Sequence, residues 1–119
     1  MLSESIMLDK SKELAISIIE LCKEIMNDRR EYILTKQLIR SGTSVGANIH
    51  EAQYSISKAD FINKMQIALK EASETEYWLI VLERTGYYDE SFSDVKQFCN
   101  SLKRMLTSTL NTAKASANI

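Results

Sequence analysis

Residues 61–82 carry the feature that most constrains the fold, a stripe of side chains that recurs at spacings of four and three without a break. The stripe consists of Phe61, Met65, Ala68, Ala72, Thr75, Leu79 and Leu82. This spacing aligns the side chains along one face of an α-helix and is typical of helices that pack against other helices. Ser57 and Asp60 match a capping box at the start of this helix, and Gly86 suits its end because glycine readily adopts the left-handed conformation there. We therefore expect a helix from about residue 57 to Gly86.

Two further segments show the same periodicity and predict amphipathic helices. One covers about residues 7–27, and its stripe consists of Leu14, Ile18, Leu21 and Ile25. The other follows a second capping box formed by Ser91 and Asp94, and we expect it to fray beyond about Lys114. Its stripe consists of Val95, Cys99, Leu102, Leu106 and Ala113.

Another helix is expected at about residues 31–54, and its middle is rich in small residues. These are Ser41, Gly42, Ser44, Gly46 and Ala47. Each glycine costs about 1 kcal/mol relative to alanine in a helix interior. We interpret the stretch as a tight helix crossing, in which the missing side chains let another backbone approach closely. The alternative is a break at Gly42 that divides the segment into two shorter helices.

The whole chain has 119 residues with no proline and three glycines, so few residues interrupt its helices. Four amphipathic helices joined by connections of a few residues place sequential neighbours antiparallel. We therefore predict an all-α fold, an antiparallel up-and-down four-helix bundle in which residues 1–119 form a single domain.

Charge and hydropathy limit the surroundings in which the chain can act. Fifteen basic and sixteen acidic residues give a net charge of −1, so no global field draws the chain toward nucleic acid or an anionic membrane. No apolar run approaches the roughly 20 residues that span a bilayer, and the first residues lack a signal-peptide pattern. We expect a cytoplasmic protein without membrane contact, in which Cys22 and Cys99 are unpaired core thiols. The alternative is that the two cysteines face each other across the core.

Because the chain has one histidine, His50, we exclude most of the enzyme mechanisms that depend on this residue type. A di-iron site needs Glu-x-x-His pairs, and the residue three before His50 is Ala47. Nucleophilic catalysis would need the same histidine beside an ordinary core cysteine. Gly42 and Gly46 lack the Gly-Lys-Ser/Thr ending of a phosphate-binding loop. We predict a protein that is not an enzyme, with no catalytic residues, no metal and no cofactor, and with a solvated His50.

Two carboxylates and one amide could be partly buried between the helices. Glu51 adjoins Ala52, Glu74 lies between two stripe positions of its helix, and Asn48 precedes Glu51 by three residues. A buried carboxylate must be paired or hydrogen-bonded. We interpret these residues as a structural polar cluster that aligns the second and third helices. A ligand or metal site around Glu51 and Glu74 is the alternative.

Basic residues gather at the first connection and the opening of the second helix. They are Arg29, Arg30, Lys36 and Arg40. Such a patch can contact phosphates of a nucleic acid. An ordinary solvated surface is the alternative, because acidic residues lie among the same charges. A weaker stripe of the same kind consists of Lys96, Lys103 and Arg104.

Residues 37–52 resemble the four-helix bundle family of 23S rRNA intervening-sequence proteins. The residues that carry this signature include Ser44, Val45, Gly46, Ala47, Asn48, Ile49, Glu51 and Ala52. Residues 60–62, residues 68–76 with Glu74, and the pair Gly86-Tyr87 resemble the family as well.

The resemblance implies an antiparallel four-helix bundle that assembles into a homo-oligomeric ring, a pentamer in known relatives. A related group, the accessory variability determinants of diversity-generating retroelements, works with a reverse transcriptase and nucleic acid. A ring would also cover apolar residues that lie outside a single stripe and mark an interface. Examples are Ile16, Ile19, Tyr77, Trp78, Ile80 and Val81.

Two functional hypotheses follow. The first is a homo-oligomeric binding module that contacts RNA or a ribonucleoprotein through basic residues repeated around the ring. The second is a protein-protein interaction scaffold that binds a partner polypeptide and no nucleic acid, which fits the slightly acidic balance of the chain.

Overall fold

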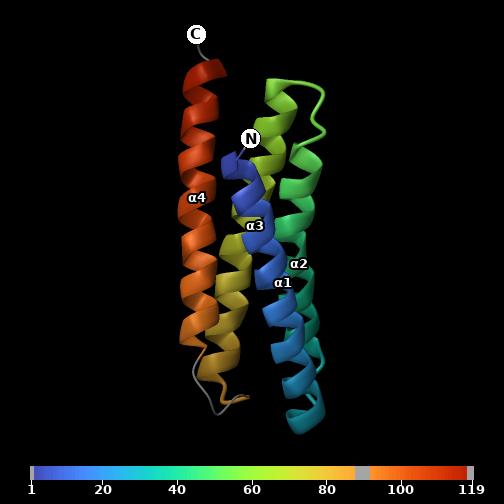
Figure 1. Cartoon of the computed structure of the whole chain (residues 1–119). Coiled ribbons are helices and arrows are strands. Elements are labelled where there is room, and N and C mark those ends of the chain that lie inside the picture. Colours follow the sequence, from blue (N-terminus) through green and yellow to red (C-terminus); the bar gives the residue numbers. More distant parts are fainter. Residues whose placement is uncertain (1, 88–91, 118–119) are drawn as a thin grey trace.

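The computed structural model describes residues 2–87 and 92–117, and these residues contain four helices and no strand. The helices are α1 (Leu2–Arg29), α2 (Ile33–Ala52), α3 (Lys58–Arg84) and α4 (Ser93–Ala117). They run alternately up and down in an elongated bundle, 52 Å long and 21 Å across (Figure 1). The predicted all-α, antiparallel four-helix bundle is confirmed.

The helices occupy the corners of a square in chain order. α1 packs against α2 and α4, and α3 packs against the same two helices, so α1 and α3 lie at opposite corners. The contact between α2 and α3 is the most extensive, and that between α1 and α4 is the least extensive. Each helix therefore keeps one outer face that no other part of the described chain covers.

Helix boundaries differ most from expectation in α1, which begins at Leu2 where we expected it near residue 7. The apolar stripe used for the prediction begins at Leu14, but Met7 and Ser11 are also buried, so the packed face extends further toward the N-terminus. α2 is shorter than expected by two residues at each end, and α4 continues to Ala117, beyond the expected start of fraying.

The core is built from the predicted stripes. All the stripe residues of α1 that we identified are buried, and from α3 only Phe61 remains partly exposed. Cys22 and Cys99 are buried and unpaired, as expected. The Cys22 thiol donates to the backbone oxygen of Thr35 at 3.6 Å, and the Cys99 thiol donates to that of Ala72 at 3.2 Å.

The glycines of α2 mark a close approach to α1, and the helix shows no break at Gly42. A Cβ atom placed on Gly42 would lie 2.5 Å from Cδ1 of Ile18, and one on Gly46 would lie 2.9 Å from Oγ of Ser11. Side chains at these two positions would therefore require α1 or its side chains to move. The expected tight helix crossing is confirmed, and its partner is α1.

The start of α3 has the predicted cap. Ser57 is extended, and its hydroxyl accepts a hydrogen bond from the backbone N–H of Asp60 at 3.1 Å. The Asp60 carboxylate accepts from the N–H of Ile56 rather than from that of Ser57, so the box is displaced by one residue. Gly86 has a φ of 77°, the left-handed conformation expected after the helix end. The second predicted box involves Ser91, which lies outside the described residues.

No helix among the described residues is long and apolar enough to cross a membrane.

Candidate functional site

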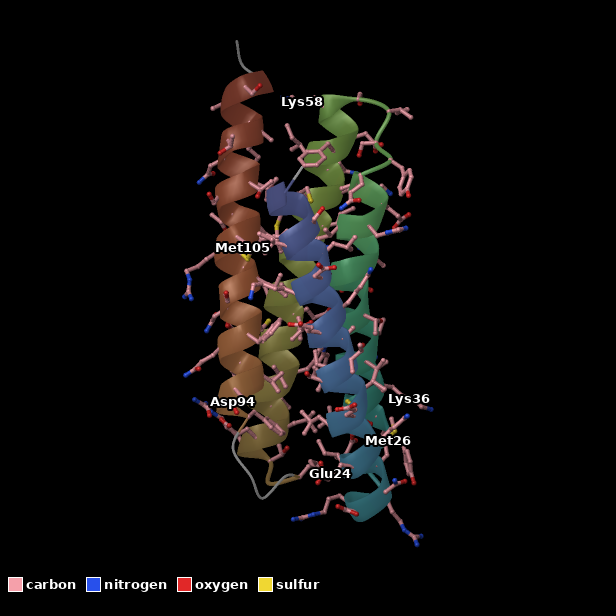
Figure 2. All side chains as sticks on the ribbon, viewed as in Figure 1. Glu24, Met26, Lys36, Lys58, Asp94 and Met105 are labelled. Carbon is pink, nitrogen blue, oxygen red and sulfur yellow. The ribbon has the colours of Figure 1, made fainter. Side chains whose placement is uncertain are left out.

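The predicted basic patch divides into two parts with different surroundings. Arg29, Arg30 and Lys36 are exposed at the end of the bundle where α1 turns into α2, and we call these three residues the basic end. Arg30 has a φ of 53°, which ends α1 and turns the chain toward α2. Figure 2 shows Lys36 at this end, close in the view to Met26 of α1.

Arg40 differs from the residues of the basic end because its guanidinium forms ion pairs with two glutamates of α3. One guanidinium nitrogen lies 2.6 Å from Oε1 of Glu74, and another lies 3.3 Å from Oε2 of Glu71. The hydrogen bond from Arg40 lowers the pKa of the Glu74 carboxyl below its usual range, against the opposing effect of burial. Arg40 is half-exposed, but its positive charge is largely compensated within the chain.

The predicted cluster of Asn48, Glu51 and Glu74 does not form as one unit. Glu74 pairs with Arg40, whereas Glu51 lies 3.9 Å from the ammonium of Lys64. The amide of Asn48 donates to the backbone oxygen of Ser44 within α2, at 2.8 Å. The ion pairs of Arg40 with Glu71 and Glu74 and that of Glu51 with Lys64 therefore connect α2 with α3 at separate places.

A buried polar contact between α2 and α3 was not identified from the sequence. The hydroxyl of Thr75 donates to the hydroxyl of Ser41 at 3.0 Å, and both residues are fully buried. Thr75 occupies a position in the apolar stripe of α3, so the pattern indicated its burial but not its partner. The contact fixes the axial register of α2 relative to α3.

Glu31 has a role that the sequence pattern did not reveal. Its carboxylate accepts hydrogen bonds from the backbone N–H groups of Ile33, Leu34 and Thr35 at 2.8 to 3.0 Å. These N–H groups lack partners within the helix because they belong to its first turn. Burial tends to raise the pKa of Glu31, but the hydrogen bonds outweigh it and lower this pKa below its usual range. Glu31 therefore caps α2 and does not act as a free surface charge.

The described residues provide no activated nucleophile and no metal-binding cluster. Burial raises the pKa of the Cys22 thiol to about 12 and that of the Cys99 thiol to about 11, so both are protonated at neutral pH. No group of three or more His, Cys, Asp or Glu residues among positions 2–87 and 92–117 could hold a metal ion. His50 is exposed, and its ring lies 5.5 Å from that of Tyr54.

The sequence model of the family described as "23S rRNA-intervening sequence protein" matches residues 3–108. This chain belongs to that family. A protein of unknown function from the S23 ribosomal protein family of Bacteroides thetaiotaomicron, whose crystal structure is known, is 44% identical in sequence to this chain. It superposes with a TM-score of 0.88, and the alignment covers 92% of this chain and 98% of that one. A comparison with curated proteins gave no match.

The signature residues of the family have different surroundings in this chain. Gly46 faces α1, Ala52 is buried, and Glu51 and Glu74 form the ion pairs described above. The hydroxyl of Ser44 donates to the backbone oxygen of Arg40 at 2.7 Å. Ala47 is exposed on α2.

Proposed function

We propose that the protein is a non-enzymatic, homo-oligomeric binding module that contacts RNA or a ribonucleoprotein. The observation that carries the proposal is the set of large apolar side chains left exposed on the outer faces of α1, α2 and α3. They are Ile6, Ile16, Tyr32, Ile33, Tyr54, Ile56 and Tyr77, counting residues that flank the helices. Exposed apolar groups that recur on several faces favour association with other protein surfaces.

The positions of these residues favour a ring. Ile16 on α1 is 57% exposed and Tyr77 on α3 is 58% exposed, and these helices lie at opposite corners of the bundle. One copy can therefore contact two neighbours with two different surfaces, which is the arrangement that closes a ring of more than two subunits. The family resemblance supports a pentamer.

The basic end supports the RNA contact. Arg29, Arg30 and Lys36 are exposed, and each copy in a ring repeats them. Weak phosphate contacts gain avidity when several copies present them on one rigid body. This arrangement reconciles RNA binding with the net charge of −1 for each chain.

Self-association is tested by multi-angle light scattering at micromolar concentration. We expect a mass several times that of one chain, and we expect Ile16→Glu or Tyr77→Glu to reduce it, because each change places a charge in the apolar contact. Thr107→Glu, on the exposed side of α4, is the matched control and should leave the mass unchanged. A monomeric wild-type protein would contradict the proposal.

RNA contact is tested by filter retention of labelled RNA at low and moderate salt. Retention should fall as salt rises, and it should be lost when Arg29, Arg30 and Lys36 are changed together to glutamine. Changing three exposed lysines away from this end, Lys12, Lys58 and Lys70, to glutamine should have a smaller effect. Wild-type protein that retains no RNA at low salt excludes this function.

A second candidate is a protein-protein interaction scaffold that binds no nucleic acid. Tyr54 and Ile56 favour it, because they are 75% and 94% exposed at the connection between α2 and α3. Large apolar residues at such a tip can anchor a partner polypeptide. A partner captured from nuclease-treated lysate, and lost with Tyr54→Ser and Ile56→Ser, would favour the scaffold over the RNA-binding module.

A further inference from the structure

The outer side of α4 differs from every other exposed surface of the bundle. We define the α4 outer face as Asn100, Arg104, Thr107, Ser108, Asn111 and Thr112, which are exposed and line one open depression together with the half-buried Lys103. None of the large exposed apolar residues of the described chain lies on α4. Residues 95–117 also contain no Asp or Glu, against four Lys and Arg residues.

Lys96 and Lys103 of α4 are already paired with glutamates of α3, and Arg104 is not. Lys96 lies 2.7 Å from a carboxylate oxygen of Glu83, and Lys103 lies 3.4 Å from one of Glu76. Among residues 2–87 and 92–117, no acceptor lies within hydrogen-bond or ion-pair distance of the Arg104 guanidinium. Its charge is therefore available to an external anion.

The other groups of the α4 outer face are amides and hydroxyls. The hydroxyl of Thr107 donates to the backbone oxygen of Lys103 at 2.8 Å and keeps its acceptor capacity. The amides of Asn100 and Asn111 form no hydrogen bond with any other group in the described ranges. Amides and hydroxyls both donate and accept hydrogen bonds, so this face can pair with ligand groups that do the same.

This composition is a poor match for a protein partner. The centres of protein interfaces are enriched in aromatic residues, Met and Arg and depleted in Ser and Lys. Interfaces with nucleic acids are more polar, more positively charged and wet. The α4 outer face has the second character, with one free cation, no carboxylate and no large apolar side chain.

Duplex RNA presents the complementary groups. Its minor groove is wide and shallow, and it displays 2′-hydroxyls that both donate and accept hydrogen bonds. Proteins recognise this groove by its shape and by contacts to 2′-hydroxyls and phosphates, with little dependence on base sequence. From Asn100 to Thr112 the α4 outer face gives a polar surface of roughly 18 Å, from the helical rise of 1.5 Å per residue.

We propose that the α4 outer face binds double-stranded RNA across its minor groove. Asn100, Thr107, Ser108 and Asn111 contact 2′-hydroxyls, and Arg104 contacts a phosphate. The inference rests on the proposed RNA-binding function and assigns it a second surface, distinct from the basic end. Because few phosphates are neutralised, the contribution of α4 depends little on salt, whereas that of the basic end depends on it strongly.

The test compares an RNA duplex with a DNA duplex of the same sequence in a fluorescence anisotropy titration. Wild-type protein should bind the RNA duplex about tenfold more tightly, because several hydrogen bonds to 2′-hydroxyls are missing in DNA. The triple variant Asn100→Ala, Ser108→Ala, Asn111→Ala should lose this preference and leave DNA binding within about twofold of wild type. Alanine favours the helix at these exposed sites, and circular dichroism checks that the variant is folded.

Matched variants separate the α4 outer face from general effects. Ser17→Ala, Asn63→Ala, Ser73→Ala removes three exposed polar groups from α1 and α3 and should keep the RNA preference. Arg104→Gln should lower the slope of log K against log salt by about one unit, and Lys70→Gln on α3 should not.

Three results would overturn the inference: equal binding of the RNA and DNA duplexes, wild-type RNA affinity in the α4 triple variant, or a preference for single-stranded RNA. If RNA binding survives the α4 variant but is lost when the basic end is neutralised, the proposed function stands without this surface. If neither the wild-type protein nor any variant binds RNA at low salt, both proposals fail. A protein from nuclease-treated lysate that binds wild type and not the α4 variant would assign the face to a protein partner instead.

Discussion

α2 and α4 lie at opposite corners of the same bundle, and they are built in contrasting ways. α2 combines large buried residues such as Leu38 and Ile49 with small residues at its closest contacts. Gly42 and Gly46 lie against α1, and Ser41 lies against α3. α4 meets its neighbours through large side chains, among them Leu102 and Leu106, which are fully buried.

The outer sides of the two helices also differ in polarity. α2 and its flanks expose large apolar residues such as Tyr32, Ile33 and Tyr54, whereas α4 exposes amides, hydroxyls and Arg104. Small residues on the inner side bring backbones together but bury little apolar area, and large residues do the opposite. α2 therefore combines a close approach to its neighbours with an outer side suited to protein contact. α4 combines an apolar inner side with an outer side suited to a polar ligand.

The largest effect is expected from removing a large core residue of α4. Leu102→Ala should lower the free energy of unfolding by about 3 kcal/mol, because it removes buried methyl groups and leaves a cavity. Urea denaturation followed by circular dichroism measures the change. Thr107→Ala on the exposed side of the same helix is the control, with an expected effect within about 0.5 kcal/mol. A similar loss for both variants would mean that α4 is not held by its apolar face.

Overpacking α2 should have the next largest effect. Gly42→Val should lower the free energy of unfolding by about 2 kcal/mol, because the added groups collide with the fully buried Ile18. The same assay applies, and Ala47→Val serves as the control because Ala47 is exposed. Equal stability of the two variants would contradict the close approach of α1 and α2.

The cap of α2 predicts a smaller, pH-dependent effect. Glu31→Gln should cost about 1 kcal/mol at neutral pH, because the N–H groups of the first turn lose a charged acceptor. The pKa of Glu31 is lower in the folded chain than in the unfolded chain. Its stabilisation is therefore complete above the unfolded pKa, about 4.3, and is lost as pH falls through the folded pKa. Thermal unfolding of both proteins from pH 3 to pH 7 should show curves that converge in acid. A constant difference over this range would exclude a charge effect.

The smallest effect concerns the two cations of α2. Arg40→Gln should weaken RNA retention less than Lys36→Gln, because the Arg40 guanidinium is already paired with Glu71 and Glu74. Filter retention at low salt compares the two variants, which carry the same change in charge. If Arg40→Gln has the larger effect, its ion pairs must open on binding, and the division of the basic patch described above is incorrect.

The sequence predicted the fold closely and the site only in part. The stripe of α3, its cap at Ser57 and the tight crossing at Gly42 follow from local patterns, and the structure confirms each of them. The grouping of Asn48, Glu51 and Glu74 was wrong as a single cluster, since these side chains bond to three different partners. Spacing along one helix shows which residues share a face, but it does not show which residue of another helix lies opposite.

Four amphipathic helices, their antiparallel order and the residues of the core could be predicted from the amino-acid sequence, because hydrophobic periodicity and capping act over a few residues. Which polar and charged groups form hydrogen bonds or ion pairs within the described chain, and which do not, follows from the packing of the helices. Arg40 and Arg104 are both arginines on helix surfaces, and one is paired while the other is not. The physical reason is that pairing depends on distances between atoms far apart in the sequence, and packing of the helices sets those distances.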